Sequence, residues 1–250
     1  MSTAPGRPTP IGFAQRLDEV RHRIDRAAAD PASVRLVAVT KGFGVDAVQM
    51  ALAAGLTDIG ENYADELVDK AQAVAAGAEE GGVSRGRSDP VWHFLGAVQR
   101  NKVARLAPVV GCWQSISRLE EGRAIARRRP GSMILVQVDV AGLPGRGGCP
   151  PDAVADLVRG LCEEDLDVAG LMAVGPPGPP EAARPGFVRV SNLADEMDLP
   201  IRSMGMTDDL EVALSEGSTM VRLGRALFGE RPLRPTPSAQ RPDPGDPPDR

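Results

Sequence analysis

The feature that most constrains the fold of this chain is an alternation of short apolar runs with stretches of helical periodicity. The predicted strands are residues 34–39, 57–61, 91–95, 112–116, 133–140, 168–174, 200–203 and 219–223. Apolar residues recur at helical spacing in the segments between them: 46–54, 63–77, 99–107, 118–129, 154–161, 182–197 and 208–215, with a short helix from about residue 225. Such alternation requires parallel strands joined by helices. We therefore predict an α/β fold, a single closed (β/α)8 barrel of TIM type, with an open doubly wound sheet as the alternative.

A further helix precedes the first strand, and the two ends of the chain differ in composition from the rest. Phe13, Leu17, Val20 and Ile24 are spaced as on one face of a helix. Residues 1–10 contain three prolines, and residues 231–250 contain seven prolines and few apolar side chains. Such segments bury too little surface to offset their ordering entropy. We therefore expect disordered ends at 1–10 and 231–250, and one domain at 11–230.

Charge and cysteine content exclude several classes of function. The formal net charge of −5 argues against a nucleic-acid-binding protein. No apolar run is long enough to span a membrane, and the N-terminus lacks the apolar core of a secretory signal, so we expect a cytoplasmic protein. Cys112, Cys149 and Cys162 form no CxxC pair, and with only His22 and His93 to assist them no metal site is predicted.

Lys41 is the first candidate site residue. In a barrel of this type the functional groups follow the C-terminal ends of the strands, and Lys41 ends an almost wholly apolar strand. The chain has only three lysines, Lys41, Lys70 and Lys102, so a retained lysine can indicate a need for an amine that arginine cannot supply. Burial lowers a lysine pKa and favours a nucleophilic amine. The alternative is a lysine that simply reaches solvent from a strand end.

Other candidates follow three further strands. Arg222 lies at the end of the last strand, and Gly224 and the amide of Arg225 open a helix, an arrangement suited to an anion. Ser203 follows the seventh strand, and Asn62 follows the second. A glycine placed for turn geometry and an asparagine that caps a helix are the corresponding structural explanations.

Taken together and in order, seven segments resemble one known family. They are Leu36–Lys41 (LVAVTK), Gly60–Tyr63 (GENY), Trp92–Gly96 (WHFLG), Gln99–Lys102 (QRNK), Gly170–Val174 (GLMAV), Ser203–Leu210 (SMGMTDDL) and Gly217–Gly224 (GSTMVRLG). This set resembles the pyridoxal phosphate homeostasis proteins (YggS-like or PROSC-like). The resemblance covers residues 11–230 and implies a barrel similar to the N-terminal domain of alanine racemase, with pyridoxal 5′-phosphate (PLP) as cofactor.

The resemblance also implies roles for individual residues. Lys41 would form a Schiff base with PLP, Arg222 would face the pyridine nitrogen, and Asn62 would lie beside the ring. Ser203, Gly224 and the Arg225 amide would hold the phosphate. A cation at the pyridine nitrogen makes PLP a weaker electron sink, which lowers the expectation of catalysis.

Two departures from the family pattern affect the expected site. Arg225 stands where the family usually has a small hydroxylated residue, so a side-chain contact with phosphate is lost or replaced by a salt bridge. Arg146 lies in the loop after the fifth strand, where a lysine is common.

Three functions are compatible with the sequence. The leading hypothesis is a monomeric protein that stores PLP or delivers it to PLP-dependent apo-enzymes, with no catalytic residue of its own. The second is a weak amino-acid racemase, which would need an acid/base residue from another domain that is not expected after residue 230. The third is an isomerase or aldolase that uses Lys41 without PLP.

Overall fold

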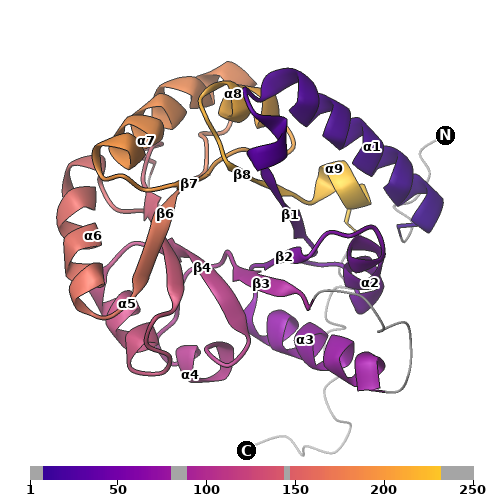
Figure 1. Ribbon diagram of the computed structural model, residues 1–250, viewed down its shortest axis with the longest axis horizontal. Helices are drawn as coiled ribbons and strands as arrows, with labels where there is room; N and C mark the ends of the chain where they lie inside the picture. The colour runs from indigo at the N-terminus through magenta and orange to yellow at the C-terminus, as the bar shows by residue number, and fades with distance from the viewer. Residues whose placement is uncertain (1–7, 80–88, 144–146, 232–250) are drawn as a thin grey trace, which may run out of the picture.

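The computed structural model describes residues 8–79, 89–143 and 147–231. Its strands are β1 (Arg35–Val39), β2 (Asp58–Glu61), β3 (Val91–Phe94), β4 (Val110–Ile116), β5 (Met133–Val138), β6 (Asp167–Ala173), β7 (Ile201–Ser203) and β8 (Met220–Leu223). All neighbouring strands are parallel, and β8 pairs with β1, so that the sheet closes into a barrel in chain order (Figure 1). The predicted barrel is confirmed, and the open sheet is excluded.

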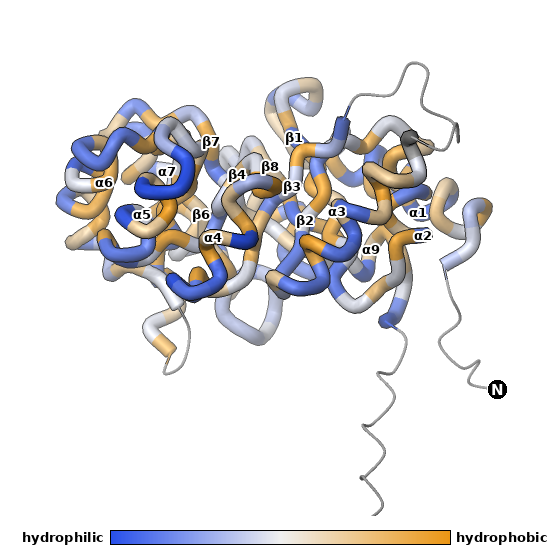
Figure 2. Tube along the Cα trace, turned by 90° about the horizontal axis from the view of Figure 1, so that it is seen from below, coloured by the Kyte–Doolittle hydropathy of each residue, from blue (hydrophilic) through white to orange (hydrophobic). Residues whose placement is uncertain are grey.

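Helices follow the strands and form the outer ring of Figure 1. They are α1 (Pro10–Ala27), α2 (Val45–Ala53), α3 (Ala64–Glu79), α4 (Val103–Leu106), α5 (Leu119–Ala126), α6 (Val154–Glu163), α7 (Arg184–Glu196), α8 (Leu210–Ser215) and α9 (Arg225–Phe228). Along these helices the tube of Figure 2 changes repeatedly between hydrophilic and hydrophobic residues. The helix predicted at 99–107 is reduced to the single turn of α4, because residues 99–102 form turns.

The additional N-terminal helix packs where the barrel closes. The four residues of its predicted stripe, Phe13 among them, are the buried ones. The Phe13 ring stacks on Phe228 of α9 at a centroid distance of 5.2 Å, and Arg23 forms an ion pair of 2.6 Å with Glu211 of α8. Helix α1 therefore covers the neighbourhood of β8.

The described part of the chain is slightly longer at both ends than the predicted domain. Thr9 caps α1 and Pro10 begins it, and Arg231 follows α9 against Gly42. Residues 8–10 and Arg231 are therefore part of the described fold, although they fall in the ends that we expected to be disordered. Residues 1–7, the tail 232–250 and Arg146 lie outside the described residues. No helix within the described ranges is long and apolar enough to cross a membrane.

The core has two parts, one on each side of the sheet. The larger part lies between strands and helices and includes Phe187, Trp113 and Leu161. A smaller cluster joins side chains from five strands, which can meet only inside the barrel: Val37, Cys112, Leu135, Met172 and Met220. Side chains alternate along a strand, so Gln114 and Arg222, two residues beyond Cys112 and Met220, also point inward. The barrel interior therefore becomes polar towards the C-terminal ends of its strands.

Candidate functional site

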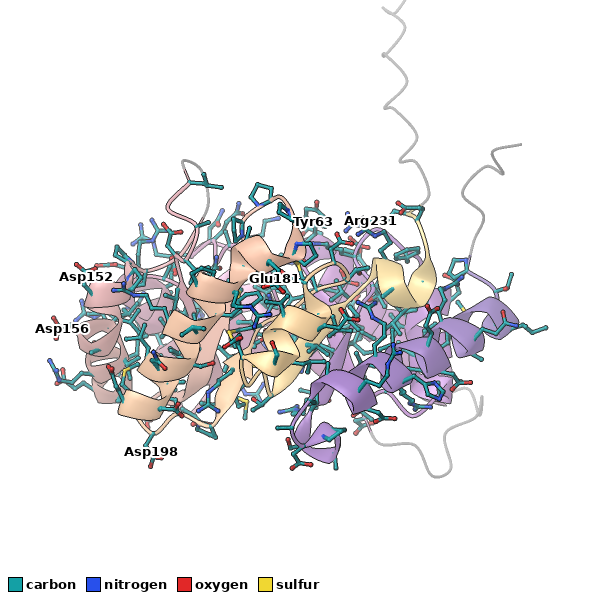
Figure 3. All side chains as sticks on the ribbon, turned by 90° about the horizontal axis from the view of Figure 1, so that it is seen from above. Tyr63, Asp152, Asp156, Glu181, Asp198 and Arg231 are labelled. Atoms are coloured by element: carbon teal, nitrogen blue, oxygen red, sulfur yellow. The ribbon has the colours of Figure 1, made fainter. Side chains whose placement is uncertain are left out.

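The candidate residues gather at the C-terminal edge of the barrel. In Figure 3, Tyr63 after β2 and Arg231 after α9 lie at this edge, whereas Asp198, in the turn before β7, lies at the opposite one. Lys41, Asn62, Ser203, Gly224 and Arg225 follow or end strands at the same edge as Tyr63.

Lys41 is half-buried in the turn that follows β1. Burial lowers the pKa of its amine, and the positive charges of Arg231 and Arg222 lower it further, while Glu61 acts in the opposite direction. A larger fraction of the amine is therefore neutral than for a lysine in water. Only the neutral amine carries the lone pair needed to attack a carbonyl group, so the environment favours a nucleophile.

Arg222 is a buried cation at this edge, with 5 % of its surface exposed. Its guanidinium donates to the Ser203 carbonyl at 2.5 Å, to the Ser203 hydroxyl at 2.7 Å and to the Ala173 carbonyl at 2.7 Å. These three acceptors are neutral. Burial lowers the pKa of Arg222 to about 10, and Asp209 partly opposes this effect. A buried cation held by neutral acceptors is suited to receive a ligand lone pair or negative charge.

The Ser203 hydroxyl begins a chain of hydrogen bonds that crosses the barrel. It donates to Gln114 Oε1 at 2.7 Å, Gln114 Nε2 lies 2.7 Å from His93 Nδ1, and His93 Nε2 lies 2.7 Å from Asp58 Oδ1. Ser203, Gln114 and His93 are completely buried. Burial lowers the pKa of His93, and the hydrogen bond with Asp58 only partly opposes this. The geometry fits a neutral ring that accepts at Nδ1 and donates at Nε2.

The chain of hydrogen bonds ends at Asp58, at the N-terminal edge of the barrel. Asp58 begins β2 and forms an ion pair with Arg35, the first residue of β1. Burial opposes ionisation of Asp58, but its contacts with His93 and Arg35 dominate and hold its pKa below the usual value. The polar chain therefore runs from the cationic edge to an anionic anchor.

Gly224 and Arg225 lie beside this cluster, where β8 passes into α9. A Cβ atom at Gly224 would lie 3.1 Å from the Val39 carbonyl oxygen, so a larger residue here would require a small shift of one of the two backbones. The Arg225 guanidinium forms an ion pair with Asp208. The Arg225 side chain is thus engaged on the surface. Its backbone amide lies in the first turn of α9, where amides have no partner within the helix.

Asn62 has a buried side-chain oxygen, Oδ1, with no hydrogen-bond partner among the described residues. An unpartnered buried acceptor costs about 1–3 kcal/mol. A hydrogen-bond donor of a ligand at the edge of β2 would remove that cost.

Sequence reasoning missed several polar residues of this region. Gln114 links Ser203 to His93, and Lys70 and Glu61 lie beneath the Lys41 turn. The rarity of lysine was a usable signal for Lys70. No local pattern marks Gln114, which looks like any polar residue of an apolar strand. Among the described residues no group of histidine, cysteine, aspartate and glutamate side chains could hold a metal ion.

Comparison with known proteins shows the family of this chain. The family model of the alanine racemase N-terminal domain matches residues 15–232. A protein of Pseudomonas aeruginosa named pyridoxal phosphate homeostasis protein is 37% identical over 234 residues, which cover 88% of this chain and 96% of that protein. The chain belongs to the pyridoxal phosphate homeostasis protein family. The family member from Escherichia coli K12 is 32% identical over 234 residues, covering 88% of this chain and 97% of its own.

A solved structure supports the same membership in the pyridoxal phosphate homeostasis family. PipY of Synechococcus elongatus, described as having PLP bound, is 27% identical and superimposes with a TM-score of 0.72, covering 87% of this chain and 100% of PipY. A structure of PipY without PLP superimposes with a TM-score of 0.74 over the same shares. The resemblance inferred from the seven sequence segments is therefore confirmed.

Proposed function

We propose that this protein binds PLP covalently through Lys41 and stores it or delivers it to PLP-dependent apo-enzymes, without efficient catalysis of its own. The observation that carries the proposal is the pairing of a half-buried amine of lowered pKa with the buried guanidinium of Arg222 at one edge of the barrel. The PLP-bound form of PipY and the name of the curated relatives support PLP as the ligand.

The residues present fit PLP on two observations. Among the described residues the Asn62 oxygen has no hydrogen-bond partner, and no carboxylate contacts the buried Arg222 guanidinium. PLP, when bound, supplies an aldehyde that an amine can capture and a ring that can withdraw electrons.

In this assignment Lys41 binds the aldehyde carbon, Arg222 faces the ring nitrogen and Asn62 lies beside the ring. The amides of Gly224 and Arg225 hold the phosphate. Ser203 requires a modified role, because its hydroxyl is already engaged with Arg222 and Gln114. We propose that it orients Arg222, and that it contacts the phosphate only by giving up Gln114.

Arg222 also explains why storage is favoured over catalysis. A permanent cation beside the ring nitrogen disfavours protonation of that nitrogen, and the electron-withdrawing power of the ring stays low. When bound beside this cation, PLP would supply only weak electron withdrawal, which supports a carrier over a racemase.

The proposal is tested by borohydride reduction of the PLP-loaded protein followed by peptide mass spectrometry. The cofactor is expected on Lys41, and Lys41→Ala should lose visible absorbance while keeping its melting temperature. Lys102→Ala is the matched control, because Lys102 is an outer lysine paired with Asp65. Cofactor on Lys70 or Lys102 would refute the assignment. Alanine racemisation at roughly 1 per second or faster would refute the carrier role.

A further inference from the structure

Directly beneath the Lys41 turn lies a cluster of three charged side chains that the proposed binding site does not use. Lys70 and Glu66 come from α3, and Glu61 ends β2. The Lys70 ammonium lies 2.6 Å from Glu61 Oε1 and 2.8 Å from Glu66 Oε1. Lys70 and Glu61 are buried, with 6% and 0% of their surfaces exposed. A buried ion pair has a desolvation cost that its attraction offsets only when its geometry is good and its remaining polar atoms are hydrogen-bonded.

The cluster holds the backbone on both sides of Lys41. Lys70 Nζ donates to the Thr40 carbonyl at 2.7 Å, and the Thr40 hydroxyl donates to Glu61 Oε1 at 2.6 Å. On the other side the Gly42 amide donates to Glu66 Oε1 at 2.7 Å. Lys41 thus lies between two peptide groups that are fixed by one cluster.

The turn needs this support because of its backbone conformation. Gly42 has a φ of +77°, in the left-handed region that glycine adopts without strain but also leaves easily. The hydrogen bond from its amide to Glu66 selects one conformation, and the bond from Lys70 fixes the preceding carbonyl. Together with the Phe43 amide, which also donates to the Thr40 carbonyl at 3.0 Å, these two contacts hold the backbone on both sides of Lys41.

Lys70 itself is not suited to bind an aldehyde. An ammonium group has three N–H donors, and those of Lys70 have three acceptors: the Thr40 carbonyl, Glu61 and Glu66. Neutralising Lys70 would leave two carboxylates without their counterion, and burial already raises the pKa of Glu61. The two lysines therefore have complementary tasks, one as a fixed cation and one as an amine.

We propose that Lys70 is a positioning residue for Lys41. Together with Glu61 and Glu66, Lys70 aims the Lys41 amine at the PLP aldehyde. This inference rests on the proposed function, in which Lys41 binds PLP. It assigns to the cluster an effect on the covalent step and not on the preceding noncovalent association, because Arg222 and Gly224 do not contact the cluster in any described hydrogen bond.

Rapid mixing of PLP with the full-length apo-protein separates these two steps. The growth of visible absorbance is followed at increasing PLP concentration for wild type, Lys70→Met and the control Lys102→Met. The limiting first-order rate constant of Lys70→Met should fall about tenfold or more, the scale expected when a reacting group is misaligned. The concentration that gives half the limiting rate should stay close to that of wild type, and Lys102→Met should match wild type throughout.

A second ligand excludes a merely structural role. Pyridoxine 5′-phosphate, the alcohol analogue, cannot react with an amine, so its dissociation constant reports the noncovalent site alone. Equal analogue binding by wild type and Lys70→Met, together with the slower covalent step, supports positioning. An unchanged limiting rate, or an equal loss of analogue binding, overturns it.

Two further measurements keep the test decisive if Lys70→Met does not fold. Thr40→Val removes only the hydroxyl contact with Glu61 and should also slow the covalent step. In wild type, the Gly42 amide should be protected from hydrogen exchange. Exchange of this amide at the rate of a free peptide overturns the proposal, and so does an unaltered rate constant of the covalent step in Thr40→Val. Lys41→Ala separates the two hypotheses, since adduct formation in that variant refutes the proposed function itself.

Discussion

Arg222 and Ser203 are joined by two hydrogen bonds, because one terminal nitrogen of the guanidinium donates both to the serine carbonyl at 2.5 Å and to its hydroxyl at 2.7 Å. Ser203 ends β7, and Arg222 is the penultimate residue of the neighbouring strand β8. A third bond to the Ala173 carbonyl of β6 ties the guanidinium to another strand. The arginine is therefore fixed before any ligand arrives, and only its planar, branched shape can make all three contacts.

Arg222→Lys should weaken PLP binding by about tenfold, because an ammonium group cannot span the same acceptors, at a cost of roughly 1–1.5 kcal/mol. Arg225→Lys is the matched control, since the Arg225 side chain is exposed and paired with Asp208. It should bind PLP nearly as wild type does. Equilibrium dialysis measures both. Equal losses in the two variants would show that the Arg225 side chain, not only its amide, contacts PLP.

Protonation of His93 should destabilise the protein as the pH falls. Burial lowers the pKa of His93 in the folded state, so below the unfolded value of about 6.5 the unfolded chain binds more protons. The stabilisation by neutral His93 is therefore complete above about pH 6.5 and is lost as the pH falls through the folded pKa.

Urea unfolding at several pH values between 7.5 and 5.5 measures this effect. His93→Gln should unfold more easily at pH 7.5 and show a shallower decline with pH, because its buried group no longer titrates. His22→Gln is the control, as His22 is exposed on α1. If His93→Gln and wild type decline in parallel, His93 does not titrate in this range.

Gly224→Ala should lower PLP affinity several-fold and stability by about 1 kcal/mol. A Cβ atom at this position would lie 3.1 Å from the Val39 carbonyl, so the backbone where β8 meets α9 must shift. Gly77→Ala provides a control in which a Cβ on α3 would contact nothing within 4 Å, and this change should stabilise the helix slightly. Calorimetry and PLP titration compare the variants. Unaltered PLP affinity in Gly224→Ala would place the phosphate elsewhere.

Of the three cysteines, only Cys162 should react with a thiol reagent in the native protein. Cys162 is exposed, whereas Cys112 lies inside the barrel, where burial raises its pKa to about 12, and Cys149 is also buried. The thiolate is the reactive form. Labelling followed by mass spectrometry should find Cys112 modified only after unfolding. Rapid native labelling of Cys112 would show that the barrel interior opens.

The sequence alone determined the architecture and the edge of the barrel at which the candidate site residues lie. Apolar periodicity is a local property, so the eight strands and the buried stripe of α1 could be predicted within a few residues. Parallel strands place their C-terminal ends together, and this brought Lys41, Asn62 and Arg222 to one edge without knowledge of any contact. The family resemblance added the cofactor.

Only the tertiary structure decided which side chains meet. Lys70 reaches Thr40 across 30 positions of sequence, and Ser203 reaches Gln114 across 89. Such pairs depend on strand register, barrel closure and helix rotation, none of which a local pattern encodes. For the same reason the engagement of the Ser203 hydroxyl and the ion pair that draws Arg225 to Asp208 emerged only from the fold. Hydrophobic spacing selects the barrel, but the polar contacts inside it follow from the three-dimensional placement of its strands.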